Sequence, residues 1–172
     1  MRKLSMAVLV ALAAIALTAC GYNLRGKQNN LPSDVRAIAI PVFENQTGEL
    51  RIERVFTDET IFQFTRSQML RVVSEDQSDV LLKGIIKKVE AEDVSLTRGS
   101  TSLQRRITIT VAAQLVRCNN GDILWENRGL AKNRTFNIVG TVQASDQFKQ
   151  VAITELAKDL AQSLHDGVLE NF

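Results

Sequence analysis

The chain has 172 residues, of which 21 are Lys or Arg and 19 are Asp or Glu, so its formal charge is +2. This near balance excludes a protein that binds nucleic acid through a globally basic surface. One histidine and two cysteines are too few for a zinc site of clustered Cys or His ligands. The length and the 45% hydrophobic content predict one domain with a core of its own.

The first 20 residues are organised like a bacterial secretion signal. A basic start precedes an uncharged, mostly apolar run at 4–17, which is too short for a comfortable membrane-spanning helix. Leu-Thr-Ala then precedes Cys20, and this looks like the lipobox of bacterial lipoproteins, whose cysteine is acylated and becomes the first mature residue. We expect a signal peptide at 1–19 and lipid on Cys20. An ordinary signal peptide with a chance cysteine is the alternative.

Removal of this signal changes the charge and the cysteine count. Residues 1–19 contain two of the 21 basic side chains and no acidic one, so the mature chain has 19 of each sign and no net charge. An anionic ligand must therefore meet a local basic patch. Lipid on Cys20 leaves Cys118 without a partner, so we expect no disulfide within the chain. Residues 20–33 are polar with glycine, asparagine and proline, which predicts a tether before a single domain at 34–172.

The domain is predicted to begin with a strand at 35–40, which ends near a proline and turn-forming residues. Residues 50–70 carry apolar side chains at helical spacing without a glycine or proline, which predicts a helix. The helix contains Phe56, Phe62 and Phe64, and all three are expected to pack on a sheet.

Three long strands are expected next, at 79–92, 106–117 and 123–138. In the first, the apolar residues thin out, so we expect that strand to leave the core part-way. In the second, every other residue from Ile107 to Leu115 is apolar, which predicts one buried face. Asn-Gly at 120–121 predicts a hairpin turn between the last two strands, and Gly129 is a candidate for a bulge.

The last element is expected to be a helix from Ser145 or Asp146 to about residue 169, with a continuous apolar stripe. The segment 93–105, rich in Ser, Thr and Arg, is expected to join two projecting strands as a hairpin. The order strand, helix, three strands, helix predicts an α+β fold. Both helices are expected on one face of a four-stranded mixed or antiparallel sheet.

The sequence does not predict catalysis, a cofactor or a metal site. Its one histidine, His165, falls in the C-terminal helix, where we expect it on the surface. The chain contains no nucleophile elbow, glycine-rich phosphate loop or His-Glu-x-x-His motif. Glu90 and Glu92 are expected on the same face of a strand, where two carboxylates could in principle form a catalytic dyad. Acidic residues on a solvated strand edge are the simpler interpretation.

Basic residues gather around the predicted projecting hairpin. The nearest ones are Arg98, Arg105 and Arg106, and the last strand presents Lys132 and Arg134 on one face, joined by Arg128 if no bulge intervenes. These side chains are suited to phosphate groups, which arginine grips with two parallel hydrogen bonds. Solubility and protection of strand edges by charge is an equally good interpretation.

The segment from Cys20 to Gly26, Cys-Gly-Tyr-Asn-Leu-Arg-Gly, resembles the mature N-terminus of the LPS-assembly lipoprotein family, LptE. In that family Cys-Gly-Tyr or Cys-Gly-Phe followed by Leu-Arg-Gly is common. The similarity extends to Leu-Pro at 31–32, to Pro-Val-Phe-Glu-Asn at 41–45 and to the long strand at 106–116.

The resemblance implies a non-enzymatic component of the outer-membrane lipopolysaccharide translocon, with two helices on a four-stranded sheet. Family members sit as a plug inside the β-barrel LptD and are thought to contact lipopolysaccharide. The protein would be lipid-anchored on the periplasmic side of the outer membrane, with which Gly21 after the cysteine is compatible. Basic residues of the family's strands and loops are implicated in lipopolysaccharide contact. From position and charge we place that contact here at Arg98, Arg105, Arg106, Lys132 and Arg134.

Two other functions stay open at this stage. The first is a periplasmic lipoprotein adaptor of another outer-membrane pore or secretion system, because residues 41–45 also resemble segments of such proteins. The second is a lipid-anchored hydrolase. The partner recovered from outer membranes tests the first alternative, because a pore other than a large β-barrel would favour the adaptor. Substrate turnover that a single substitution abolishes would favour the hydrolase.

Overall fold

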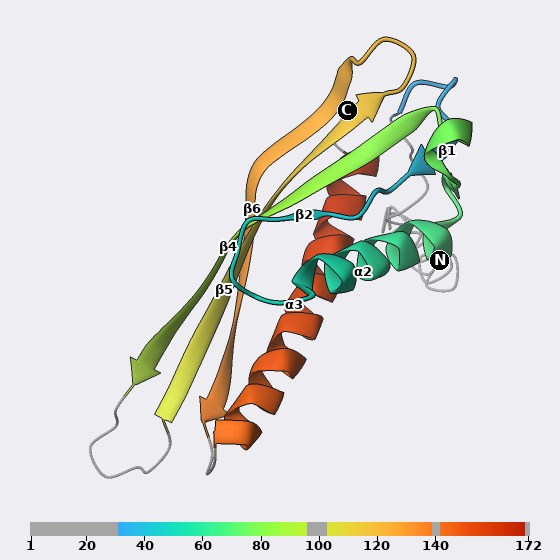
Figure 1. The fold of residues 1–172 in the computed structure, drawn as a ribbon. Helices are drawn as coiled ribbons and strands as arrows, with labels where there is room; N and C mark the ends of the chain where they lie inside the picture. The colour runs from blue at the N-terminus through green and yellow to red at the C-terminus, as the bar shows by residue number, and fades with distance from the viewer. Residues whose placement is uncertain (1–30, 96–102, 139–141, 171–172) are drawn as a thin grey trace, which may run out of the picture.

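The computed structural model describes residues 31–95, 103–138 and 142–170 (Figure 1). The predicted signal peptide, Cys20, most of the tether and Arg98 lie outside these ranges. The elements in chain order are β1 (Ala37–Ala39), β2 (Glu44–Asn45), α2 (Ile52–Ser67), β3 (Arg71–Val72), the 3-10 helix η1 (Glu75–Gln77), β4 (Val80–Ser95), β5 (Leu103–Arg117), β6 (Ile123–Ile138) and α3 (Val142–Glu170).

All strands belong to one mixed sheet. Its order is β3-β1-β4-β5-β6, and β2 pairs with β4 beside that path. The short strands pair in parallel, whereas β4, β5 and β6 form an antiparallel meander. The predicted α+β class and the order of the long elements are confirmed. The sheet has more strands than the four predicted, because β2 and β3 are two residues long and too short to show a period in the sequence.

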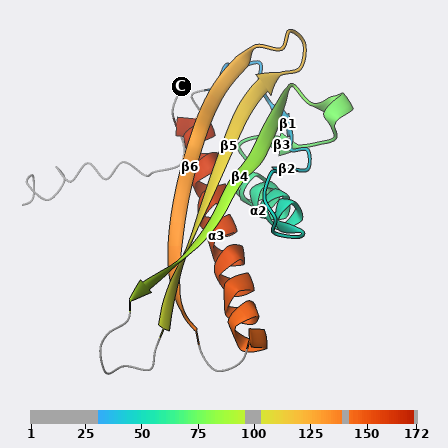
Figure 2. The ribbon, with the colours of Figure 1, turned by 60° about the vertical axis from the view of Figure 1, so that its left-hand side comes forward.

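Both helices lie on the same side of this sheet, as predicted (Figure 2). Helix α2 is shorter than the predicted 50–70 at each end. Arg51 and Gln68 have φ angles of 64° and 57°, and a right-handed helix cannot continue through that conformation. Helix α3 starts at Val142, earlier than the predicted Ser145 or Asp146.

The core lies between the sheet and the helices. Alternate residues of β5 from Ile107 to Leu115 are at most 2% exposed, so the predicted buried face is confirmed. Thr108, Thr110 and Gln114 point to the opposite side, which no helix of the described chain covers and which we term the helix-free face. One long strand therefore has an apolar and a polar side, as its sequence period requires.

The three phenylalanines of α2 do not all pack inward. Phe56 and Phe64 are fully buried, and the ring of Phe56 lies 6.5 Å from that of Phe43. Phe62 is 53% exposed and has Arg66 over its ring, so the prediction for this residue was wrong. At about 100° per residue, Phe62 lies about 240° around the helix from Phe56, on the side that faces solvent.

The connection between β1 and β2 approaches β4 very closely at Gly84. A Cβ atom on Gly84 would lie 2.2 to 2.5 Å from three atoms of the Phe43 ring. Phe43 is 2% exposed, and its backbone N–H donates to the Thr57 hydroxyl of α2. Glycine at this position therefore lets one ring pack against both the sheet and α2.

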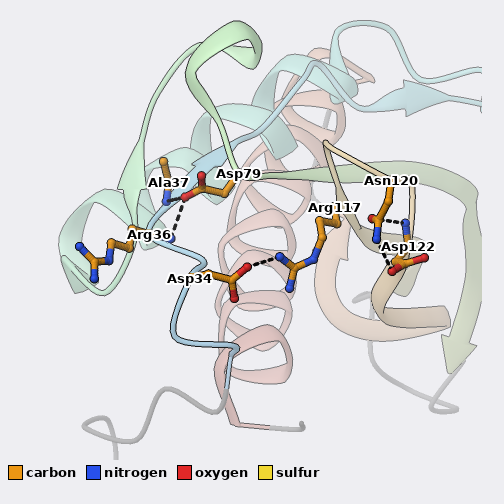
Figure 3. A network of polar contacts seen from close by, with 7 residues as sticks. All are labelled: Asp34, Arg36, Ala37, Asp79, Arg117, Asn120 and Asp122. Carbon is orange, nitrogen blue, oxygen red and sulfur yellow. Dashed lines mark hydrogen bonds and ion pairs between the residues drawn. The ribbon is translucent and has the colours of Figure 1, made fainter.

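At one end of the sheet a polar network connects β1 and the segment before it to the start of β4 and the end of β5 (Figure 3). The Asp79 carboxylate accepts the backbone N–H groups of Arg36 and Ala37, each at 2.8 Å. Arg117 donates to Asp34, and this hydrogen bond lowers the pKa of Asp34. In the turn itself Gly121 has a φ of 76°, which confirms the predicted hairpin.

Two bulges divide the three long strands into halves. In β4 the register shifts between Ile86 and Lys88, and in β6 Arg128 and Gly129 together face the single residue Ala112. The bulge predicted at Gly129 is thus confirmed. We call residues 80–86, 111–117 and 123–127 the proximal half, and residues 88–95, 103–110 and 130–138 the distal half. Bulges bend and twist a sheet, in keeping with the curvature of the strands in Figure 2.

Candidate functional site

The described cations of the predicted binding site all lie in the distal half of the sheet. Arg105 and Arg106 follow one another on β5, so they project to opposite faces. Lys132 and Arg134 pair with Ile109 and Ile107, so they share one face of β6, as predicted, and this face carries the helices. Arg128 belongs to the bulge and not to this series.

The two arginines of β5 form ion pairs with the neighbouring strand β4. The Nε atom of Arg105 lies 2.8 Å from Asp93 Oδ1, and this hydrogen bond raises the pKa of Arg105. Arg106 Nη1 lies 3.3 Å from Glu92 Oε1 on the helix-free face. Both arginine side chains remain about 40% exposed, at 41% and 39%, so the rest of each guanidinium faces solvent.

Arg134 connects the last strand to helix α3. Its guanidinium contacts the carboxylate of Glu155 and lies 3.0 Å from Asp159 Oδ2, and both acidic residues belong to α3. Lys132, two residues earlier, is exposed and has no ion pair with any residue of the described ranges. Arg134 is 41% exposed and shares its charge with two carboxylates of α3.

The chemistry of this region is that of charge pairs. Glu90 and Glu92 do share the helix-free face, but Lys88 lies 3.8 Å from Glu90 and Arg106 contacts Glu92. Each carboxylate thus has its own cation, which does not favour a shared-proton dyad. Among the described residues, no three His, Cys, Asp or Glu side chains gather as metal ligands would.

His165 does not lie on the helix surface, and this prediction was wrong. Its side chain is 16% exposed and packs edge-on against Phe64 of α2, with 5.0 Å between ring centroids. Its Nδ1 atom lies 3.1 Å from Asp166 Oδ1, and its buried Nε2 atom has no hydrogen-bond partner within the described part of the chain. The crossing of α2 over α3 covers a position that looked exposed in the sequence.

Sequence reasoning missed a trough of about 550 Å³ on the helix-free face of the proximal half. Its lining includes Val42, Lys83, Ile85, Lys87, Ala112 and Arg128. These residues come from the β1–β2 connection and from all three long strands, so no local sequence motif predicts that they lie together. The only sequence signal was Gly129, whose bulge turns Arg128 out of the regular strand series.

This fold is shared with solved structures of bacterial proteins, several of which are lipoproteins. Uncharacterized lipoprotein B from Nitrosomonas europaea has a TM-score of 0.54 and 16% identity, with 87% of this chain and 90% of that chain covered. A minor lipoprotein from Acinetobacter baumannii has a TM-score of 0.50 and 16% identity, covering 77% of this chain and 90% of its own. Protein XCC0632 from Xanthomonas campestris has a TM-score of 0.51 and 14% identity, with coverages of 82% and 89%. Such low identities establish the fold alone, and no curated protein matches the chain.

The fold thus defines the class, an α+β domain with two helices on one side of a mixed sheet. The model of the lipopolysaccharide-assembly family LptE matches residues 35–166, which is most of the chain, so the chain belongs to the LptE family. This is a family of non-enzymatic lipopolysaccharide-assembly lipoproteins, and membership supports such a role here. In the described ranges, no helix is both long and apolar enough to cross a membrane.

Proposed function

We propose that this protein is an outer-membrane lipoprotein that plugs an LptD-like β-barrel, supports its assembly and binds lipopolysaccharide during export to the outer leaflet. The family match over residues 35–166 carries the proposal. The lipobox ending at Cys20 supplies an anchor. Each buried methylene of an acyl chain contributes about 0.8 kcal/mol, so several chains hold the domain at the periplasmic leaflet.

The surface of the sheet supports the plug role. On the helix-free face of the distal half, Thr108, Thr110 and Asn133 lie beside the ion pair of Arg106 with Glu92. The lumen of a large membrane barrel is polar, and a polar sheet face is suited to it. An equal number of acidic and basic residues in the mature chain is consistent with the same surroundings.

The arginines of the distal half support the lipopolysaccharide contact. A guanidinium carries five N–H donors, and the ion pairs of Arg105 and Arg106 each use one nitrogen atom of the side chain. Exposed ion pairs contribute about 1 kcal/mol or less, so a phosphate group competes with them readily. On the helix side of the sheet Lys132 and Arg134 on β6 would add to the charge of Arg105, and Arg98 in the adjoining segment completes the proposed contact.

Affinity purification from outer membranes in mild detergent tests the plug role. A large β-barrel recovered in constant proportion with the chain supports the proposal. A different pore recovered in its place would support the adaptor function and contradict the plug. Mass spectrometry of the mature N-terminus is the companion measurement, because an unmodified thiol on Cys20 would contradict the lipid anchor.

Lipopolysaccharide binding is tested with a charge reversal of Arg98, Arg105 and Arg106 to Glu. We expect about a tenfold loss of affinity, since hydrogen bonds to charged groups contribute about 1.5 to 3 kcal/mol when one is broken. The matched control reverses three exposed cations elsewhere, at Arg54, Arg71 and Lys158. Equal affinities of the two triple variants would remove the site assignment and leave the plug role standing.

A further inference from the structure

The distal half of β4 is a strand edge that no other described strand covers. On the side of β4 that faces away from β5, β1 pairs with residues 80–81 and β2 pairs with residues 85–86. From Lys88 to Asp93 no strand of the described ranges pairs with that side. Figures 1 and 2 agree, because neither shows a described element beside this end of β4 on the side away from β5.

The backbone of Ile86 fixes the direction of the main-chain groups near this edge. Its carbonyl oxygen accepts the backbone N–H of Gln46 at 3.0 Å, so Ile86 directs its main-chain groups toward β2 and away from β5. Its register partner Val111 on β5 is therefore in a pair without backbone hydrogen bonds. Bonded and non-bonded pairs alternate along an antiparallel ladder, so the even-numbered residues of β5 from Arg106 to Thr110 direct theirs toward β4.

Three residues of β4 point their main-chain groups outward. Beyond the bulge, the even-numbered residues from Lys88 to Glu92 pair with the even-numbered residues of β5, so they form the hydrogen bonds between these two strands. Val89, Ala91 and Asp93 alternate with them and direct their N–H and C=O groups to the open side. The edge thus presents a row of backbone donors and acceptors that repeats about every 7 Å.

This edge has few of the features that protect open strands. Native proteins shorten an edge strand, or interrupt it with proline or a bulge. The strands β2 and β3 have two residues each, whereas residues 88–93 of β4 contain no proline, glycine or register shift. Charge is the remaining protection, and here it is paired. Lys88 lies 3.8 Å from Glu90, and both Glu92 and Asp93 contact arginines of β5.

The side chains of the edge indicate which strand fits beside it. Because each charged side chain of residues 88–93 has a partner, a further charge opposite them would gain little. A second copy of the chain is disfavoured, since two-fold pairing along this stretch would place Glu90 opposite its own copy or the copy of Glu92. Val89 and Ala91 on the helix side favour apolar, β-branched neighbours.

We propose that the distal edge of β4 binds an uncharged, extended segment of a partner protein as an additional strand of the sheet. Hydrogen bonds to the main chain of Val89, Ala91 and Asp93 supply the affinity, as in other complexes formed by strand addition. Alternate side chains of the segment pack beside Val89 and Ala91, and the others lie on the helix-free face. The inference goes beyond the proposed function, because it requires neither lipopolysaccharide nor a barrel.

Hydrogen exchange followed by NMR tests the edge directly. The full chain is used in non-ionic detergent micelles, with the capped peptide Lys-Thr-Val-Thr-Val-Thr-Lys as the probe. The amides of Val89, Ala91 and Asp93 are expected to exchange at least about tenfold more slowly with saturating peptide, whereas those of Glu90 and Glu92 are protected in both states. The absence of saturable binding at millimolar peptide would overturn the proposal. Protection that rises with chain concentration alone would show self-pairing and would also overturn it.

Methylation of peptide nitrogens separates strand addition from other modes of binding. An added strand directs alternate amides toward β4, namely those of the valines if it runs antiparallel to β4 and those of the threonines if it runs parallel. One peptide is methylated at both valine nitrogens and the other at the nitrogens of the two threonines that follow them. We expect one of them to lose affinity at least about tenfold and the other less than about threefold. Equal losses would contradict an added strand.

A proline variant of the chain completes the test. Ala91→Pro removes one outward amide, and proline is tolerated on an edge strand whose N–H faces solvent. Peptide binding should weaken at least about fivefold. The matched control is Ala131→Pro on β6, which pairs with Thr110 and so directs its amide away from β5, and it should change binding less than about twofold. Equal binding by the two variants would overturn the proposal, and if Ala91→Pro does not fold, the methylated peptides decide.

Discussion

The proximal and distal halves of the long sheet have the same strands but different surroundings. In the proximal half, Leu82, Ile86 and Leu115 are fully buried under the helices, and Phe43 adds a layer between β4 and α2. In the distal half Glu92 and Asp93 are exposed, in agreement with the prediction that this strand leaves the core part-way. There Ile107 and Ile109 are still fully buried on the helix side, and Arg134 contacts α3 at the edge of this smaller core.

This difference separates stability from surface chemistry. Burial of large apolar side chains contributes about 1.5 to 3 kcal/mol each, whereas exposed ion pairs contribute about 1 kcal/mol or less. Substitutions of the exposed charged residues in the distal half therefore change the charge of the surface at little cost to folding.

The largest expected effect is in the proximal core. Phe56→Ala should lower the free energy of unfolding by about 3 to 5 kcal/mol, because Phe56 is fully buried against Phe43. Phe62→Ala on the same helix is the control and should change it by less than about 0.5 kcal/mol, since Phe62 is 53% exposed. Urea unfolding followed by circular dichroism measures both. Similar losses would show that α2 is not anchored as described.

A smaller loss is expected at the contact between β4 and the β1–β2 connection. Gly84→Ala should lower the free energy of unfolding by about 1 to 3 kcal/mol, because its Cβ would overlap the buried Phe43 ring. Gly129→Ala, also in a long strand, has nothing within 4 Å of the new Cβ and should be nearly neutral. A neutral Gly84→Ala, measured by thermal unfolding, would mean that the ring moves aside easily.

In the distal half the expected coupling is weaker. A double-mutant cycle with Arg134→Gln and Asp159→Asn should give a coupling energy below about 1 kcal/mol, because both side chains are 41% to 47% exposed. The coupling should fall further at 1 M salt, where charges are screened within about 3 Å. The same cycle for Arg128 and Glu126 should be closer to zero, since Arg128 is 84% exposed. A salt-independent coupling above about 2 kcal/mol would contradict the description of this pair as an exposed surface contact.

The smallest effect concerns pH at the proximal end. Because Arg117 lowers the pKa of Asp34 in the folded protein, this pair stabilises the fold at pH above the unfolded value of about 3.9. That contribution is lost as the pH falls toward the lowered folded value. Carboxyl NMR titration should show Asp34 titrating at higher pH in Arg117→Gln than in the unchanged chain. An identical titration in both would disprove the contact.

Local sequence patterns were enough where one segment decides its own structure. The alternation from Ile107 to Leu115 predicted the buried face of β5, and Asn-Gly at 120–121 predicted the hairpin with Gly121 at positive φ. Gly129 predicted the bulge of β6. The lipid on Cys20 and the lipopolysaccharide contact of Arg98 remain predictions, because both residues lie outside the described ranges.

The errors concern which side of a helix meets a neighbour. Phe62 falls on an apolar stripe that is wider than the surface α2 buries, so its sequence looked like core. His165 is flanked by a leucine and an aspartate, and only the crossing of α2 encloses it against Phe64. The helical period predicts on which side of a helix a side chain lies. It does not predict which side the neighbouring helix covers.

The sequence alone determined the type and order of the long elements, because hydrophobic period and turn residues act within a few positions along the chain. The tertiary structure decided what meets across the strands: Arg134 with Asp159, and Val42, Ala112 and Arg128 around one trough. These positions are distant in sequence and become neighbours only through the strand registers and the two bulges. Register is set by long-range pairing, which a single sequence does not display.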